Sequence, residues 1–151
     1  MLLSFLGGER RGAQVVGFLR VDEEPILLKC QTKHPDQLII FDLSLVDGKE
    51  IFQELKPGGI ILLNTDKEID GFEGLRMFKI GLIDAARIAT SVGFGGTFNM
   101  AMLGAHVRLI NLIKIEALIE AVKATVPAKV EENVEAVKEA YERVRIYEIG
   151  A

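Results

Sequence analysis

The chain has 151 residues, of which 49% are hydrophobic, and it carries a formal net charge of −4 at pH 7. This length suits one domain with a sizeable core, so we expect residues 1–151 to form a single unit. The acidic balance, the absence of tryptophan and an aromatic content of 7% exclude a basic nucleic-acid footprint, a polybasic membrane patch and a base-stacking platform.

The N-terminal part of the sequence predicts a β-hairpin. Residues 14–21 are rich in Val, Phe and Leu, which favour a strand. The polar residues 22–25 (DEEP) form a turn, and residues 26–29 return as the second strand. We expect these two strands to pair antiparallel at the edge of a sheet.

Residues 38–80 predict strands that alternate with helices. Residues 38–41 are a short, continuous apolar run, typical of a strand buried in a parallel sheet. A helical pattern covers residues 43–55 and ends before Pro57. Two further apolar runs, residues 60–63 and 77–80, predict the next strands. The sequence therefore predicts a Rossmann-like α/β fold with an open, mainly parallel sheet, flanking helices and right-handed crossovers.

The last third of the chain predicts helices only. Asp84 is a good N-cap for the first of them, and Thr97 for the second. In the last two, apolar residues recur at the i, i+3, i+4, i+7 spacing of an amphipathic helix. We expect these helices at residues 85–91, 98–109, 112–124 and 130–144.

Two glycines in residues 93–97 (GFGGT) are candidates for phosphate binding. Gly95 and Gly96 precede a predicted helix, whose first backbone N–H groups can hold an anion. A turn between two helices uses glycine for its backbone freedom alone, and a dinucleotide fingerprint follows a strand rather than a helix. The simple turn is therefore the interpretation that the context favours.

Arg10 and Arg11 are the second candidate. Two adjacent guanidinium groups offer planar arrays of donors for a carboxylate or another anion. The alternative is a charge cluster that is solvated or lies at a subunit interface.

The remaining polar residues predict no catalytic centre. Asp42 and Asn64 follow strands at the edge where open α/β sheets bind ligands, but we interpret them as helix caps and turn formers. His34 and His106 have no partner at metal-ligand or catalytic spacing. Cys30 is interpreted as a small buried hydrophobe.

The composition also indicates where the protein works. No run of about 18 apolar residues occurs, so no transmembrane helix is predicted. A single cysteine forms no internal disulfide and fits a reducing compartment. We therefore expect a cytoplasmic protein that contacts neither nucleic acid nor membrane.

Three stretches resemble the gamma subunit of the 2-oxoacid:ferredoxin oxidoreductases. They are residues 9–13 (ERRGA), 55–64 (LKPGGIILLN) and 99–105 (NMAMLGA), and the C-terminal helices also fit. The first and third are more similar to the pyruvate and branched-chain enzymes than to the 2-oxoglutarate type. The resemblance covers essentially the whole chain and implies one gamma-type domain.

In that family, a complex of alpha, beta, gamma and delta subunits oxidatively decarboxylates a 2-oxoacid to acyl-CoA and reduces ferredoxin. The resemblance implies that thiamine diphosphate, Mg and [4Fe-4S] clusters belong to the partner subunits. This chain alone is expected to bind no cofactor, because one cysteine cannot replace the four thiolates of a cubane cluster.

The resemblance also implies roles for individual residues. Arg10, Arg11 and Asn99 become candidates for contact with coenzyme A or with another subunit, and no residue is expected to be catalytic. The chain would then contribute to assembly and to the coenzyme A route.

One departure from the family pattern stands out. The opening strand, glycine-rich G-x-G-G-x-G loop and first helix, together the first βα unit, are missing. Three explanations stay open: the true start lies upstream, another chain supplies the segment, or the sheet is rebuilt around the gap. The departure argues against nucleotide binding by this chain alone.

Two other functions remain as alternatives. One is a stand-alone nucleotide- or CoA-binding module, for which Gly95 and Gly96 argue. The other is a structural oligomerisation domain.

Overall fold

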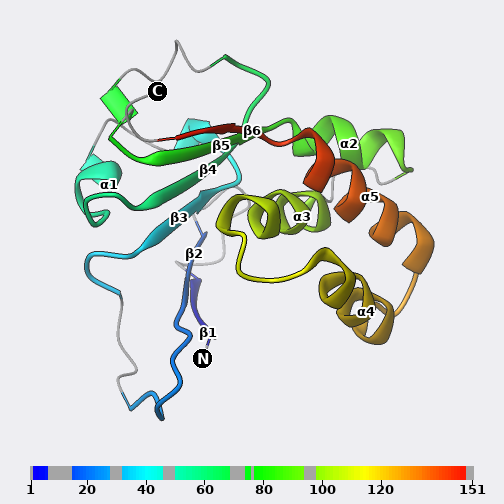
Figure 1. Cartoon of the computed structure of the whole chain (residues 1–151), viewed down its shortest axis with the longest axis horizontal. Helices are drawn as coiled ribbons and strands as arrows, with labels where there is room; N and C mark the ends of the chain where they lie inside the picture. The colour runs from blue at the N-terminus through cyan, green and yellow to red at the C-terminus, as the bar shows by residue number, and fades with distance from the viewer. Residues whose placement is uncertain are drawn as a thin grey trace.

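The computed structural model describes residues 2–6, 15–27, 32–45, 50–68, 74–75, 77–93 and 98–148. Two sheets are present in these residues, and Figure 1 shows both. The smaller pairs β1 (Leu2–Leu6) antiparallel with β2 (Val15–Leu19). The larger has the order β3-β4-β5-β6, from Gln37–Ile40, Ile60–Asn64, Lys79–Ile83 and Arg145–Tyr147.

The centre of the larger sheet is parallel and buried on both faces. β4 pairs parallel with β3 on one side and with β5 on the other. Its residues Ile61, Leu62 and Leu63 have no exposed surface. A continuous apolar run is what such a strand needs, because successive side chains point to opposite covered faces. The predicted α/β class with an open, mainly parallel sheet is therefore confirmed.

Helices cover the two faces unequally. One face, with Leu62 and Ile83, packs against the longer helices, and the opposite face, with Ile61 and Leu63, packs against Phe52 and its neighbours. Figure 1 shows α4 lying outside α3 and α5, and these three helices share a separate apolar cluster. The helices are η1 (Leu43–Leu45), α1 (Glu50–Gln53), α2 (Ala85–Ser91), α3 (Asn99–Ile110), α4 (Ile115–Thr125) and α5 (Val130–Arg143).

Gly104 allows α3 and α5 to pack closely. A Cβ atom on Gly104 would lie inside contact distance of the Val137 carbonyl oxygen and 2.9 Å from the carbonyl carbon and Cα of the same residue. Those atoms are backbone, so no side-chain rotation relieves the overlap. The absence of a side chain at this one position therefore sets the distance between the two helices.

The predicted N-terminal hairpin was wrong in its second strand. β2 pairs with β1 over all five of its residues, from Val15 opposite Leu6 to Leu19 opposite Leu2. Ile26 and Leu27 are not in a strand, and residues 28–29 lie outside the described part of the chain. The apolar segment at the start of the chain provides a full-length partner, whereas Pro25 removes a backbone donor where the return strand would begin.

Three further elements differ from the prediction. The helix expected at residues 43–55 is reduced to η1 and α1, and residues 46–49 between them lie outside the described part. The third parallel strand extends to Ile83 rather than ending at residue 80. It continues through Gly81, where a Cβ atom would lie 2.7 Å from Leu109 Cδ2, so the glycine makes room for α3. The helical C-terminal third also ends in a strand, β6, which pairs antiparallel with β5.

Candidate functional site

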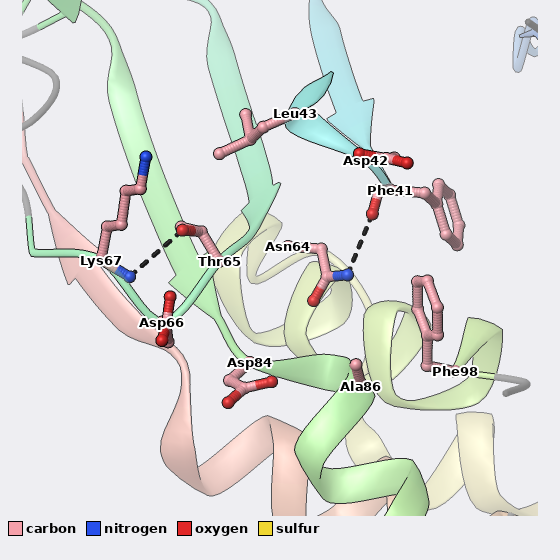
Figure 2. Close-up of a pocket in the computed structure, with 10 residues that line it drawn as sticks. All are labelled: Phe41, Asp42, Leu43, Asn64, Thr65, Asp66, Lys67, Asp84, Ala86 and Phe98. Carbon is pink, nitrogen blue, oxygen red and sulfur yellow. Dashed lines mark hydrogen bonds between the residues drawn. The ribbon is translucent and has the colours of Figure 1, made fainter. Parts of the chain in front are cut away.

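An open hollow lies where β3 and β4 end and α2 and α3 begin. Its volume is about 450 Å³. Carboxyl ends of parallel strands form the edge of an α/β sheet at which ligands bind. Figure 2 shows the lining residues, which are Phe41, Asp42, Leu43, Asn64, Thr65, Asp66, Lys67, Asp84, Ala86 and Phe98.

Asn64 joins the three segments that form the floor of the hollow. It is the last residue of β4, and its Nδ2 donates to the carbonyl oxygen of Phe41, after β3, at 2.9 Å. Its Oδ1 accepts from the backbone N–H of Ala85, the first residue of α2, also at 2.9 Å. Figure 2 shows the first of these bonds as a dashed line. One amide side chain thus fixes the end of a neighbouring strand and the start of a helix.

Carboxylates dominate the charge around the hollow. Asp42, Asp66 and Asp84 all line it, with Lys67 as the one cationic side chain among the described lining residues. Like charges repel, so this rim disfavours phosphate groups and suits neutral or cationic ones. The charge of the described rim therefore does not favour an anion.

Two of these carboxylates also organise the backbone around them. Hydrogen bonds from the Ser44 hydroxyl and from the Ser44 backbone N–H hold the pKa of Asp42 below its usual value. The backbone bond measures 2.9 Å at Oδ1. Asp84 accepts from the backbone N–H of Arg87 at 2.9 Å and so caps α2, as predicted. Asp42 is the turn former that the sequence predicts, and it lines the hollow as well.

Two phenylalanines form an apolar wall. The rings of Phe41 and Phe98 are 6.0 Å apart with an interplanar angle of 34°. Phe41 is 44% exposed and directly follows β3, which is an edge strand with only Ile40 buried rather than the buried strand that the sequence predicts. Figure 2 shows both rings on the same side of the hollow. Such a wall offers apolar surface to an aliphatic or planar group of a ligand.

Arg145 fixes the loop that carries Asp66 and Lys67. Its guanidinium donates to the backbone oxygens of Asp66 at 3.3 Å and Lys67 at 2.8 Å, and pairs with Glu68 Oε1 at 2.6 Å. Because Arg145 lies on β6, the antiparallel strand that the sequence analysis missed, its role at the site was missed too.

His106 connects α3 to the start of β3, outside the hollow. Its Nε2 lies 2.6 Å from Gln37 Oε1, which accepts the ring N–H. Burial lowers the pKa of His106 below its usual value of 6.5, because a charged imidazolium loses its hydration there. The histidine is therefore neutral in the folded protein near neutral pH.

We expect this burial to make the folded state acid-sensitive. The unfolded chain protonates His106 as the pH falls through about 6.5, whereas the folded chain resists protonation until lower pH. The contribution of neutral His106 to the free energy of unfolding is thus fully present above pH 6.5 and is lost as the pH falls toward the lower pKa of the folded state. Urea unfolding at about pH 7.5 and about pH 5.5 should show a smaller loss in His106→Gln than in the unsubstituted protein. An equal loss in both proteins would contradict this role.

The other residues singled out from the sequence are placed only in part. Asn99 is the first residue of α3 and is exposed beside Phe98, which lines the hollow. Arg10, Arg11, Gly95 and Gly96 lie outside the described residues, as do Cys30 and Thr97. The N-cap of α3 is Phe98, so the predicted capping by Thr97 was wrong. The roles expected of the other residues stay predictions.

The described residues contain neither a metal-ligand cluster nor a membrane-spanning helix. No group of three or more His, Cys, Asp or Glu in the described ranges is placed to hold a metal ion. No helix within the same residues has the length and apolar character needed to cross a membrane.

Sequence comparison links the chain to one family. Residues 3–143 match the family model described as pyruvate ferredoxin/flavodoxin oxidoreductase. The chain is 38% identical over 149 residues to the pyruvate/ketoisovalerate oxidoreductases common subunit gamma of Pyrococcus furiosus, covering 96% of this chain and 80% of the relative. It is 37% identical over 141 residues to the pyruvate synthase subunit PorC of Methanothermobacter thermautotrophicus, covering 93% and 76%.

The fold is also shared with a solved structure. The pyruvate oxidoreductase subunit PORC of Thermotoga maritima superposes with a TM-score of 0.78 at 29% sequence identity. The match covers 98% of this chain and 82% of that one. The similarity in sequence and in structure thus extends over nearly all of this chain.

Proposed function

Because the chain belongs to the pyruvate ferredoxin/flavodoxin oxidoreductase family, we propose that it is the gamma subunit of a multi-subunit 2-oxoacid:ferredoxin oxidoreductase. The observation that carries the proposal is the similarity over 96% of this chain and 80% of a relative named as such a subunit. Pyruvate and a branched-chain 2-oxoacid are the substrates that the relatives' names favour.

The chemistry of decarboxylation and electron transfer is assigned to partner subunits of the alpha, beta and delta types, with ferredoxin as acceptor. A cubane cluster needs four thiolates, and the full sequence has one cysteine, so the residues of this chain do not fit that group. Thiamine diphosphate and its Mg ion are likewise assigned to the partners. The role proposed for this chain is non-catalytic, in assembly and in the passage of coenzyme A.

The hollow beside Asn64 gives the coenzyme A proposal a definite form. Its rim repels phosphates, so the pyrophosphate and 3′-phosphate of coenzyme A would lie elsewhere. The Phe41 and Phe98 wall and the carboxylate acceptors suit the neutral pantetheine arm, whose amide and hydroxyl groups donate hydrogen bonds. Arg10 and Arg11 are then the candidates for the phosphates, and Asn99 for a polar contact next to the wall.

The assembly proposal is tested on the protein from its own cells. Native mass spectrometry with iron and thiamine analysis of the same fraction should find this chain in a large complex that holds both. If Arg10 and Arg11 contact another subunit rather than coenzyme A, substitution of both by Ala should weaken the association of this chain with the complex. Recovery of the chain alone, without iron or thiamine, would contradict the proposal.

The hollow favours a second candidate function, a CoA-binding module that acts without partners. Because the subunit proposed above uses the same hollow, calorimetric titration of the isolated chain with coenzyme A distinguishes the two functions only together with the native mass spectrum. Heat that disappears when Phe98 is replaced by Ala would support the stand-alone module. No heat at about 1 mM ligand, which corresponds to about −4 kcal/mol of binding free energy, would exclude it.

A further inference from the structure

The segment that follows β2 ends in an exposed tip that is both apolar and acidic. Val21 and Leu27 are 88% and 87% exposed, and Asp22, Glu23 and Glu24 stand between them in the sequence. We call residues 21–27 the arm tip. Its three carboxylates form no ion pair with another residue in the described part of the chain.

The strand that leads to the arm tip also lacks a cover. Val15 and Leu19 on one face of β2 are 58% and 66% exposed, and Val16 on the other is exposed as well. A two-stranded sheet is at best marginally stable in water unless a further surface packs on it. Figure 1 shows β1 and β2 projecting from the larger sheet rather than packing beneath a helix. The apolar side chains of β2 are therefore available for contact with another molecule.

A second exposed surface has the opposite charge. The connection between α3 and α4 presents Leu112, 80% exposed, and Ile113, 49% exposed, with Lys114 directly after them. Arg108, in the last turn of α3, lies one turn before Leu112 with its guanidinium 5.3 Å from the centre of the Tyr141 ring. We call Arg108 and residues 112–114 the basic loop.

We propose that the arm tip of one copy of this chain docks on the basic loop of a second copy. Each surface has two large exposed apolar side chains beside charged groups. The arm tip carries three negative groups and the basic loop carries two positive groups. Both surfaces are exposed in one molecule, so they do not cover each other within the chain. Because this chain carries both members of a complementary pair of surfaces, a second copy is the partner that we propose.

A twofold arrangement satisfies both surfaces at once. In a symmetric dimer, residue i of one subunit contacts residue j of the other, and the reverse contact follows. In Figure 1, the arm and the α3–α4 connection are both drawn below the larger sheet. The proposed dimer pairs the arm tip of each subunit with the basic loop of the other. The proposal does not depend on the function proposed above.

The test uses the full chain and charge reversal at exposed positions, which leaves folding intact. Analytical ultracentrifugation over about 1–100 μM should show a monomer–dimer equilibrium for the unsubstituted protein. Glu23→Lys with Glu24→Lys, or Lys114→Glu alone, should weaken it about tenfold or more, because each change occurs twice in a twofold dimer. Combining all three changes should restore most of the affinity. Lys138→Glu, exposed on α5, is the matched control and should have no effect.

Three outcomes would overturn the proposal. The first is a monomer at all concentrations, and the second is a dimer that the charge reversals leave unchanged. The third is that the purified chain is a monomer and the same charge reversals remove it from the oxidoreductase complex, because the arm tip would then contact a partner subunit. Failure of the proposed function looks different, because it concerns iron and thiamine in the isolated complex rather than self-association.

Discussion

Replacing Gly104 by alanine is expected to destabilise the protein by about 3 kcal/mol, a cost at the upper end of overpacking. The new Cβ would overlap the backbone of Val137, so α3 and α5 must separate. Separation also opens the apolar cluster that these helices share with α4 and that contains Val107 and Val134. Alanine gains about 1 kcal/mol of helix propensity over glycine, and the expected loss remains after that gain. Urea unfolding measures the difference directly.

A second glycine provides the control. Gly93 has φ +90°, and nothing lies within 4 Å of where its Cβ would be. Gly93→Ala therefore tests backbone strain without a clash, and we expect a loss of about 1 kcal/mol. The prediction is contradicted if Gly104→Ala is as stable as the parent, or if it loses less stability than Gly93→Ala. Either result would show that α3 and α5 separate at little cost.

The parallel strands and the last helices could be predicted because their signals are local. Residues 60–63 carry the apolar run of a strand buried on both faces, and α5 begins at Val130 as the apolar spacing predicts. The family resemblance based on residues 9–13, 55–64 and 99–105 is confirmed by the family match. The strand, the helix and the family motifs each depend on residues that are close together in the sequence, so they could be predicted without knowledge of tertiary contacts.

The elements that were missed depend on contacts between distant residues. β1 becomes a strand because it finds β2, and β6 because it finds β5. The extension of β5 through Gly81 becomes clear only when Leu109 of α3 is seen above it. A short segment such as Arg145–Tyr147 carries too little pattern to reveal such pairing.

The candidate site was predictable at single positions but not as a constellation. Asp42 and Asn64 were placed at strand ends from the sequence, and both line the hollow. Phe41 looked like the end of a buried run, and only its exposure and its contact with Phe98 reveal the apolar wall. An apolar residue at the exposed end of a parallel strand is the one local signal that was available.

Replacing Asn64 by leucine should have the largest effect at the site. The change keeps the side-chain size but removes both hydrogen bonds, leaving the Phe41 carbonyl and the Ala85 N–H without their partner. A polar group deprived of its partner costs about 1–3 kcal/mol, so we expect the free energy of unfolding to fall by about 2 kcal/mol. Hydrogen exchange should also quicken at the start of α2, because Asn64 is what holds Ala85 there.

Two further variants show whether geometry or charge is responsible. Asn64→Asp keeps an acceptor for the Ala85 N–H but places a second oxygen against the Phe41 carbonyl oxygen. We therefore expect it to weaken the attachment of the end of β3 to β4 and to leave the start of α2 in place. Asp66→Ala changes an exposed side chain on the same rim and should alter stability by no more than about 0.5 kcal/mol. If Asn64→Leu is as stable as Asp66→Ala, solvent replaces both bonds and Asn64 does not hold the hollow together. If only Asn64→Leu exchanges faster at α2, one amide side chain fixes the floor of the hollow, and the shape of the site depends on it.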